Sequence, residues 1–83
     1  MQVQVRYFAS LREALGPSET VELADGSTLA QLRDGLIARG GAHAQVLARG
    51  RALRCALNQV MADEGTVVPS GAEVAFFPPV TGG

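Results

Sequence analysis

The chain has 83 residues, a formal net charge of −1, one cysteine and no tryptophan, and 47% of its residues are apolar. A chain of this length forms one small domain that buries only roughly 60–65% of its unfolded surface, which leaves no room for a deep internal active site. A single cysteine excludes an internal disulfide framework and a multi-cysteine zinc site. We therefore expect no metal site, and we expect any chemistry to lie at the edge of the domain or in a partner protein.

The amino-terminal sequence MQVQVRYF alternates polar and apolar residues, whereas a signal peptide has a charged start followed by an apolar run. No stretch of the chain approaches the roughly 20 apolar residues that span a bilayer. We therefore expect a cytoplasmic protein that does not bind a membrane. The near-neutral charge also disfavours binding to nucleic acid, because such proteins normally carry a strong basic excess.

The basic residues are unevenly placed along the chain. No acidic residue occurs between Asp34 and Asp63, and the same stretch holds four arginines: Arg39, Arg49, Arg51 and Arg54. One side of the molecule is therefore predicted to be mildly basic. All seven basic residues are arginine, and a compositional bias that also enriches alanine and glycine is the favoured explanation.

The first third of the chain predicts two strands around a short helical turn. Residues 2–7 have the alternation of a strand with one buried face, and the apolar positions are Val3, Val5 and Tyr7. The same alternation places Phe8 on the outward side. A helical turn over residues 9–15 follows, and Gly16-Pro17 ends it. Residues 20–23 alternate again and predict the second strand.

One amphipathic helix is predicted over residues 29–37. Thr28 and Gln31 have the spacing of a capping box, in which each side chain satisfies a free amide of the first helical turn. The apolar stripe of this helix consists of Leu29, Leu32, Leu36 and Ile37. Gly40-Gly41 ends the helix. A second short helical turn is predicted over residues 42–49.

The last third of the chain predicts three more strands. Residues 53–57 alternate, residues 60–61 follow after a tight turn, and residues 73–77 alternate again until Pro78-Pro79 ends the strand. One helix and several strands in a short chain favour an α+β fold in which the helix lies across one face of a mixed sheet, the β-grasp arrangement. We expect the first and last strands to lie side by side in the middle of that sheet.

Two parts of the chain follow from this pattern: a β-grasp domain over residues 1–77 and a flexible, extended tail over residues 78–83. Two prolines stiffen the root of the tail, and the last two glycines remove side-chain bulk from its tip. Six residues extend roughly 20 Å. Such a tail can enter a narrow channel and present its carboxylate to another protein's active site; a frayed terminus is the alternative.

The sequence resembles the small subunit of molybdopterin synthase along its whole length. The ending Phe-Pro-Pro-Val-Thr-Gly-Gly at residues 77–83 is quite specific for that subunit, whereas the β-grasp pattern and a terminal Gly-Gly also occur in the thiamine-pathway sulfur carrier and in ubiquitin-like modifiers. Three shorter segments carry the rest of the resemblance: Tyr7-Phe8-Ala9, Leu11-Arg12-Glu13 and Leu57-Asn58-Gln59.

The resemblance implies that the chain is a sulfur carrier. In that family a ubiquitin-activating-like enzyme uses ATP to adenylate the terminal glycine, here Gly83, and a sulfurtransferase converts the adenylate to a thiocarboxylate. The tail, with Thr81 and Gly82 giving access, then enters a large subunit that binds cyclic pyranopterin monophosphate. Two small and two large subunits form the complex. The small subunit is inert alone and holds no cofactor tightly.

Four residues are candidates for contact with the partner. The outward phase of Phe8 and Phe77, on strands expected to be neighbours, predicts two exposed aromatic side chains near the root of the tail. The alternative for Phe8 is packing under its own short helix. Met61 and Arg12 are added by the resemblance, since they match family positions near the partner.

Two other reactive residue types are interpreted as structural. Cys55 lies on the inward phase between Leu53 and Leu57, so we expect a buried, unreactive thiol. His43 follows two glycines without a second metal ligand nearby, and we expect a solvated loop histidine.

Two other classes of function remain open from the sequence. One is a sulfur carrier for thiamine, cysteine or transfer-RNA thiolation, and the other is a ubiquitin-like protein modifier or a plain interaction module. The arginine-only composition has a second interpretation under either carrier function. No lysine ε-amine of the chain is available to attack its own activated terminus.

Overall fold

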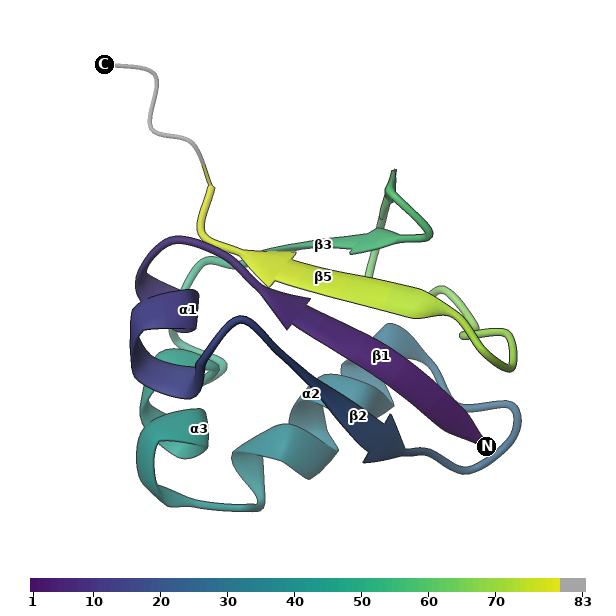
Figure 1. Ribbon diagram of the computed structural model, residues 1–83, viewed down its shortest axis with the longest axis horizontal. Coiled ribbons are helices and arrows are strands. Elements are labelled where there is room, and N and C mark those ends of the chain that lie inside the picture. The colour runs from purple at the N-terminus through teal and green to yellow at the C-terminus, as the bar shows by residue number, and fades with distance from the viewer. Residues whose placement is uncertain (80–83) are drawn as a thin grey trace.

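The computed structural model describes residues 1–79 and shows a five-stranded mixed sheet with its helices gathered on one face (Figure 1). This confirms the predicted α+β architecture. The elements in chain order are β1 (Gln2–Tyr7), α1 (Ser10–Leu15), β2 (Ser18–Glu22), α2 (Leu29–Ile37), α3 (Gly41–Val46), β3 (Arg54–Leu57), β4 (Val60–Ala62) and β5 (Glu73–Phe77).

The first and last strands lie side by side in the interior of the sheet, as predicted. The strand order is β2-β1-β5-β3-β4, and β1 runs parallel to β5 with Tyr7 opposite Phe76. The other pairs are antiparallel: β1 with β2, β5 with β3, and β3 with β4. Because β1 and β5 are parallel, the last residue of β1 and the start of the C-terminal segment lie at the same end of the sheet.

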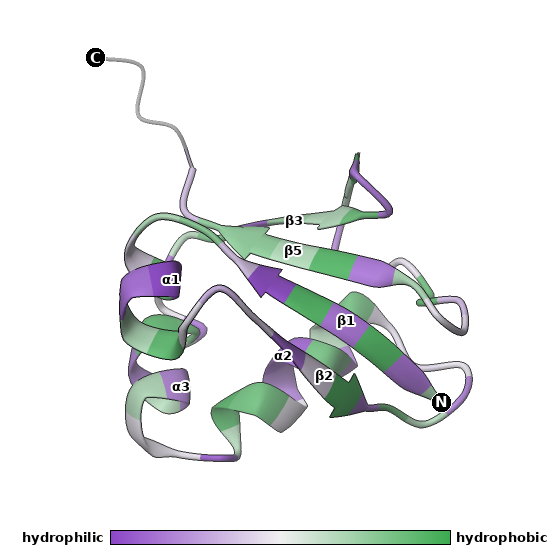
Figure 2. Cartoon of the chain, in the orientation of Figure 1, coloured by the Kyte–Doolittle hydropathy of each residue, from purple (hydrophilic) through white to green (hydrophobic). Residues whose placement is uncertain are grey.

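The core lies between the sheet and the helices. Strand β1 alternates between exposed and buried residues, and its hydropathy alternates in the same way (Figure 2). Helix α2 begins at the predicted capping box, in which the Gln31 amide donates to Thr28 Oγ1 (3.2 Å) and the Thr28 amide donates to Gln31 Oε1 (2.8 Å). The largest fully buried side chains are Tyr7, Phe76, Leu29, Leu32, Leu36, Leu47, Val3, Val5, Val68 and Val74.

Several element boundaries differ from the expectation by one to three residues, most of all the end of α3 at Val46 instead of residue 49. Strand β2 begins at Ser18, two residues earlier than predicted, because the Tyr7 amide already bonds to the Pro17 carbonyl (3.0 Å) and pairing continues from there. Leu23 lies outside β2, and its amide donates to the Met1 carbonyl (2.8 Å). The predicted second helical turn is present as α3, entered through Gly40 at φ 75°, a conformation that favours glycine.

A buried arginine joins α2 to two loops. The Arg33 guanidinium donates to the carbonyls of Leu47 (2.8 Å), Ala48 (2.6 Å) and Arg51 (3.1 Å), and it forms an ion pair with Glu64 (2.8 Å). The side chain is only 4% exposed. Burying a charge is tolerable only when its donors are satisfied, and here they are distributed over four acceptors. Arg33 therefore fixes the segment between α3 and β3.

The C-terminal segment is described as far as Pro79. Strand β5 ends at Phe77, and Pro78 and Pro79 follow it half-buried. The rest of the predicted tail, residues 80–83, lies outside the described residues. Within residues 1–79, no helix has the length and apolar character needed to cross a membrane.

Candidate functional site

The root of the tail lies where β1 and β5 end together. The Phe8 amide, directly after β1, donates a hydrogen bond to the Phe76 carbonyl (3.3 Å) in β5. Phe77 and Pro78 follow Phe76, so the chain leaves the sheet next to Phe8 (Figure 1). This end of the sheet is therefore where Pro78 and Pro79 leave the domain.

Phe8 is exposed because the chain reverses immediately after it. Ala9 adopts φ 53° and ψ −130°, a conformation that L residues rarely adopt, and α1 begins at the next residue. The amides of Leu11 and Arg12 both donate to the Phe8 carbonyl (3.1 and 3.4 Å), which ties α1 to this position. The Phe8 side chain is 39% exposed, with the Arg6 guanidinium carbon 5.6 Å from its ring centre. Phe8 thus points outward, as predicted, and does not pack beneath α1.

Phe77 is less exposed than the alternation predicted. It lies at the end of β5, an interior strand with β1 on one side and β3 on the other, and it pairs with Arg54 of β3. These neighbours leave the Phe77 side chain half-buried. The expectation that Phe77 is exposed is therefore met only in part, because the pattern of one strand does not report cover from its neighbours.

Small residues connect the aromatic pair to Met61 across the outer face of the sheet. Ala75 of β5 pairs with Ala56 of β3, and Ala56 pairs with Met61 of β4. Met61 is 56% exposed at the far edge of this row. We call this apolar surface the outer-face patch: Phe8, Ala56, Met61, Ala75 and Phe77. Ala56 is only 7% exposed, so the accessible part of the patch consists of Phe8 and Met61 together with the half-buried Ala75 and Phe77.

The remaining predicted site residues have two different outcomes. Arg12 lies in α1 and is exposed, one turn after Phe8, and its contact with a partner stays a prediction. Gly83, Gly82 and Thr81 lie outside the described residues. Their roles stay predictions.

The predicted basic side is partly neutralised in the fold. Arg39 forms an ion pair with Glu19, and Arg49 forms ion pairs with Asp34 (2.6 Å) and Glu64. These carboxylates come from segments far away in sequence, which the uneven distribution of acids along the chain could not reveal. Arg51 and Arg54 are exposed, and Arg54, at the start of β3, pairs with Phe77 at the root of the tail.

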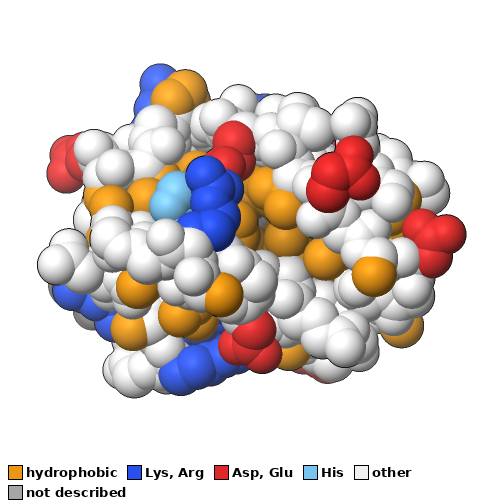
Figure 3. Space-filling view, turned by 90° about the horizontal axis from the view of Figure 1, so that it is seen from below, with side chains coloured by type: hydrophobic (Ala, Val, Ile, Leu, Met, Phe, Trp, Pro, Cys, Tyr) orange, Lys and Arg blue, Asp and Glu red, His pale blue; other side chains and the backbone are white. Residues whose placement is uncertain are grey.

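His43 is not the solvated loop residue that we expected. It lies in α3 with a side chain only 17% exposed, its Nε2 is 2.8 Å from Glu19 Oε2, and its ring meets the ring of Tyr7 edge-on at 6.4 Å. On the helix-bearing face, the single histidine lies beside an arginine side chain and a carboxylate (Figure 3). Packing of α3 against the ends of β1 and β2 creates this cluster, which no local sequence signal indicates.

Glu19 is the centre of that cluster. Burial alone would raise the pKa of Glu19, but hydrogen bonds from His43, Arg39 and the Tyr7 hydroxyl outweigh it and lower the pKa to about 2. Burial is the main cause that raises the pKa of Tyr7 well above its ordinary value. The Glu19 carboxylate, which accepts a hydrogen bond from the Tyr7 hydroxyl (2.8 Å), raises it further. Through these contacts Glu19 of β2 connects His43 of α3 to Tyr7 of β1.

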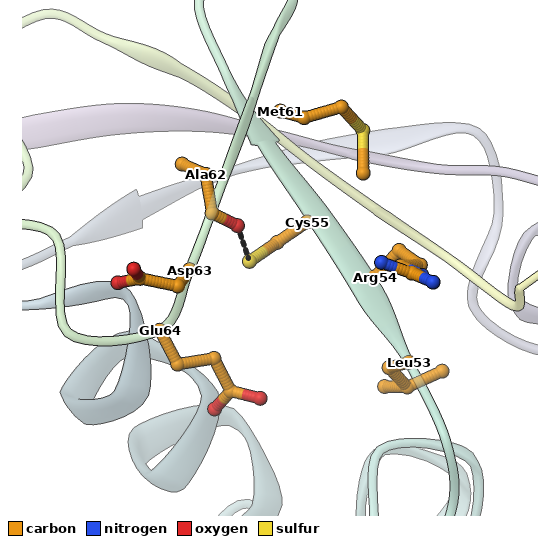
Figure 4. Close-up of a pocket in the computed structure, with 7 residues that line it drawn as sticks. All are labelled: Leu53, Arg54, Cys55, Met61, Ala62, Asp63 and Glu64. Atoms are coloured by element: carbon orange, nitrogen blue, oxygen red, sulfur yellow. Dashed lines mark hydrogen bonds between the residues drawn. The ribbon is translucent and has the colours of Figure 1, made fainter.

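A groove of about 460 Å³ opens where β4 diverges from β3, next to the outer-face patch. Its walls carry Met61 and Arg54 on one side and Asp63 and Glu64 on the other (Figure 4). Cys55 turns its sulfur toward the Ala62 carbonyl, to which it donates a hydrogen bond (3.2 Å). The residue is 4% exposed, and burial raises the pKa of its thiol. The expectation of a buried thiol is confirmed.

Comparison with known proteins identifies the family. The family model described as "ThiS family" matches residues 5–83, nearly the whole chain. The chain belongs to the ThiS family. The molybdopterin synthase sulfur carrier subunit of Escherichia coli (strain K12) is 40% identical over 81 residues, which cover 98% of this chain and 99% of that protein. The subunit of the same name from Haemophilus influenzae is 38% identical over 82 residues, with coverage of 98% and 99%.

Solved structures of other proteins share the fold of this ThiS-family chain. Small archaeal modifier protein 1 of H. volcanii superposes with a TM-score of 0.78 at 25% identity, over 95% of this chain and 98% of that one. A chain in the complex of subunits 1 and 2 of the molybdopterin-converting factor from Helicobacter pylori superposes with a TM-score of 0.70 at 26% identity, over 100% of both chains. The β-grasp fold and the resemblance to molybdopterin synthase small subunits are thus confirmed.

Proposed function

We propose that this chain is the sulfur carrier of a molybdopterin synthase. The observation that carries the proposal is the match to sulfur carrier subunits over nearly the full length of both chains, at 35–40% identity in three relatives. Matching lengths mean that the tail and the domain correspond together, and the family match continues to residue 83. The proposal assigns the reaction to the Gly83 carboxylate.

The chemistry begins with a carboxylate, which is a poor acyl donor. A ubiquitin-activating-like enzyme joins the Gly83 carboxylate to the AMP part of ATP and releases pyrophosphate. A sulfurtransferase then supplies sulfur at the oxidation level of sulfide, which attacks the carbonyl carbon; the C–S bond forms as the bond to AMP breaks, and AMP leaves with the electron pair. The product is a thiocarboxylate at Gly83, with Gly82 and Thr81 small enough to enter a narrow channel.

The described residues supply the docking surface for this reaction. The outer-face patch adjoins the root of the tail, so a partner that covers Phe8 and Phe77 also receives the tail. In the Helicobacter pylori relative, subunits 1 and 2 of the molybdopterin-converting factor form a complex. We propose the corresponding large subunit as the partner here, in a heterotetramer of two small and two large subunits. Cyclic pyranopterin monophosphate and the groups that bind it belong to that subunit, in the cytoplasm.

Complementation tests this proposal in a bacterial strain that lacks its own sulfur carrier subunit and therefore makes no molybdenum cofactor. The chain is expected to restore the activity of a molybdenum enzyme, provided that it can interact with the host large subunit. A variant with one alanine added after Gly83 is expected to restore none, although its domain is unchanged. Restoration by the extended variant would contradict the proposal, since its carboxylate is displaced from the reacting position.

A second candidate function is a ubiquitin-like protein modifier. The observation that favours it is the similarity in fold to an archaeal protein whose name describes it as a modifier. This function requires amide bonds between the C-terminus of this chain and lysines of other proteins. Epitope-tagged chain expressed in its own host distinguishes the two: tagged conjugates that disappear when Gly83 is deleted favour the modifier. Growth that depends on added thiamine or cysteine after gene deletion would instead indicate another thiolation pathway.

A further inference from the structure

We infer that the amines and the thiol of this chain are withheld from its own activated C-terminus, so that the activated carrier transfers only to nucleophiles of other molecules. This inference rests on the proposed function, because it concerns the activated Gly83 acyl group. It adds a selectivity that the family assignment does not contain: the carrier forms neither an internal amide nor chains linked to further copies of itself.

The first observation is that the chain contains arginine but no lysine. All seven basic residues of the sequence are arginine. A lysine amine in its neutral form attacks an acyl adenylate, whereas a guanidinium stays protonated at any physiological pH and offers no free lone pair. Arg33 and Arg49 each form several hydrogen bonds through the branched guanidinium, so the geometry of these two positions explains why they hold arginine. The exposed side chains of Arg12, Arg51 and Arg54 form no hydrogen bond within residues 1–79, and Arg54 pairs with Phe77 at the root of the tail.

The second observation concerns the amine of Met1. It donates to the Leu23 carbonyl (2.8 Å) and lies 3.6 Å from Asp25 Oδ1 and 3.8 Å from Glu22 Oε2. It also lies at the opposite end of β1 from the tail root, because β1 and β5 are parallel (Figure 1). A six-residue strand spans about 20 Å, so only a fully extended six-residue tail would cover that separation. The amine is thus both bound and distant.

The third observation concerns Cys55, the only thiol of the chain. Its sulfur faces the Ala62 carbonyl beneath the groove, and the residue is 4% exposed (Figure 4). An exposed thiolate would attack the activated carbonyl and form a thioester. Because β4 covers the Cys55 thiol, this reaction with the activated carbonyl is prevented. Three independent features, one of composition and two of structure, therefore have the same consequence for the activated terminus.

The excluded reaction is ordinary aminolysis. The amine nitrogen attacks the carbonyl carbon of the activated Gly83, a C–N bond forms, the bond to the leaving group breaks, and the amine proton goes to solvent. A lysine near the tail root would undergo this reaction intramolecularly, at an effective concentration in the millimolar range for a short tether. The proposed selectivity can therefore be tested by adding single lysines to the chain.

The test uses the full chain prepared as a C-terminal aryl thioester by intein cleavage, which needs no activating enzyme, ATP or sulfur donor. Arg54→Lys and Arg12→Lys place an amine beside the tail root, because Arg54 pairs with Phe77 and Arg12 lies one turn after Phe8. Gln2→Lys is the matched control, with an exposed amine at the opposite end of β1. Intact mass spectrometry follows each protein at about 50 µM and pH 8.

We expect the wild-type thioester to give only the hydrolysed acid. At least one of the two variants near the root is expected to form an internal amide, one water lighter than the acid, roughly twentyfold faster than Gln2→Lys forms linked dimers, given a millimolar effective concentration. Internal amide or dimers from the wild-type chain at the rate of Gln2→Lys would overturn the inference. So would hydrolysis alone in all three variants. Failure of ATP-dependent activation in a separate assay would contradict the proposed function without altering this result.

Discussion

Phe8 and Phe76 are joined by a backbone hydrogen bond (3.3 Å) that fixes an exposed aromatic side chain beside the exit of the C-terminal segment. The bond exists because β1 and β5 are parallel neighbours that end at the same end of the sheet. The position of Phe8 is therefore set by the sheet itself and not by a mobile loop. A partner that binds this end of the sheet meets Phe8 and the tail root together.

Phe8→Ala is expected to weaken binding of the large subunit without destabilising the domain. An aromatic side chain at the centre of an interface contributes about 2 kcal/mol or more to binding, whereas an exposed one contributes little to folding. Val67→Ala, another exposed apolar residue but outside the outer-face patch, is the control. Calorimetric titration with the purified large subunit measures the effect. Equal affinity of the two variants would remove Phe8 from the interface.

Arg33→Met is expected to lower the free energy of unfolding by about 3–5 kcal/mol, because Glu64 and three backbone carbonyls lose a buried donor. Arg33→Lys keeps the charge but not the branched geometry, so an intermediate loss is expected. The control is Arg6→Met, whose side chain is 47% exposed and 3.8 Å from Glu73; its effect should stay below about 1 kcal/mol. Urea denaturation measures all three. A similar small loss in Arg33→Lys, Arg33→Met and the control would show that the arginine network does not stabilise the fold.

Glu19 makes the stability of the domain depend on pH in the acid range. Its pKa falls from the ordinary 4.5 to about 2 on folding, so the folded state favours the ionised form. The stabilisation is complete above about pH 4.5 and is lost as the pH falls toward 2. Glu19→Gln should therefore be less stable than wild type at pH 7, by about 1–3 kcal/mol for hydrogen bonds to a charged group.

The same measurement at lower pH tests the cause. The difference between Glu19→Gln and wild type should shrink between pH 4.5 and pH 2, because wild-type Glu19 then becomes neutral. Glu13→Gln, an exposed carboxylate in α1, should change stability little at either pH. A difference for Glu19→Gln that stays constant with pH would mean that packing, and not charge, explains the loss.

Cys55 should react slowly with thiol reagents in the folded protein. Its thiol is buried and its pKa is raised, so reaction requires β4 to open and the thiol to ionise. If opening costs about 3 kcal/mol, modification at pH 8 is roughly 100-fold slower than in urea. A colorimetric disulfide reagent measures both rates on the same protein. Similar rates in buffer and urea would contradict burial of the thiol and with it one part of the selectivity inferred above.

The sequence predicted those features that depend on local periodicity. Alternation identified β1 and its inward Val3, Val5 and Tyr7, and the Thr28–Gln31 capping box placed the start of α2 at the observed residue. The central, adjacent position of the first and last strands followed from the crossover through the helix. Exposure of Phe8 followed from the same alternation.

Features that depend on contacts between distant segments were missed. His43 bonds to Glu19 across 24 positions of sequence, and Phe77 is covered by strands on both sides. Arg33 could have been recognised, since it lies four residues after Leu29 and three before Leu36 and so shares their buried face. Its charge suggested an exposed residue, although helical spacing indicated the opposite.

The most direct test of the proposed sulfur carrier is the intact mass of the chain purified gently from its own host. The account predicts a fraction of molecules in which one sulfur replaces one oxygen, localised by fragmentation to the last peptide and thus to Gly83. This species should increase when the purified chain is incubated with ATP, a sulfur donor and host extract. A mass that stays unmodified after that incubation, with the activating enzyme shown to be active on another substrate, would contradict the account.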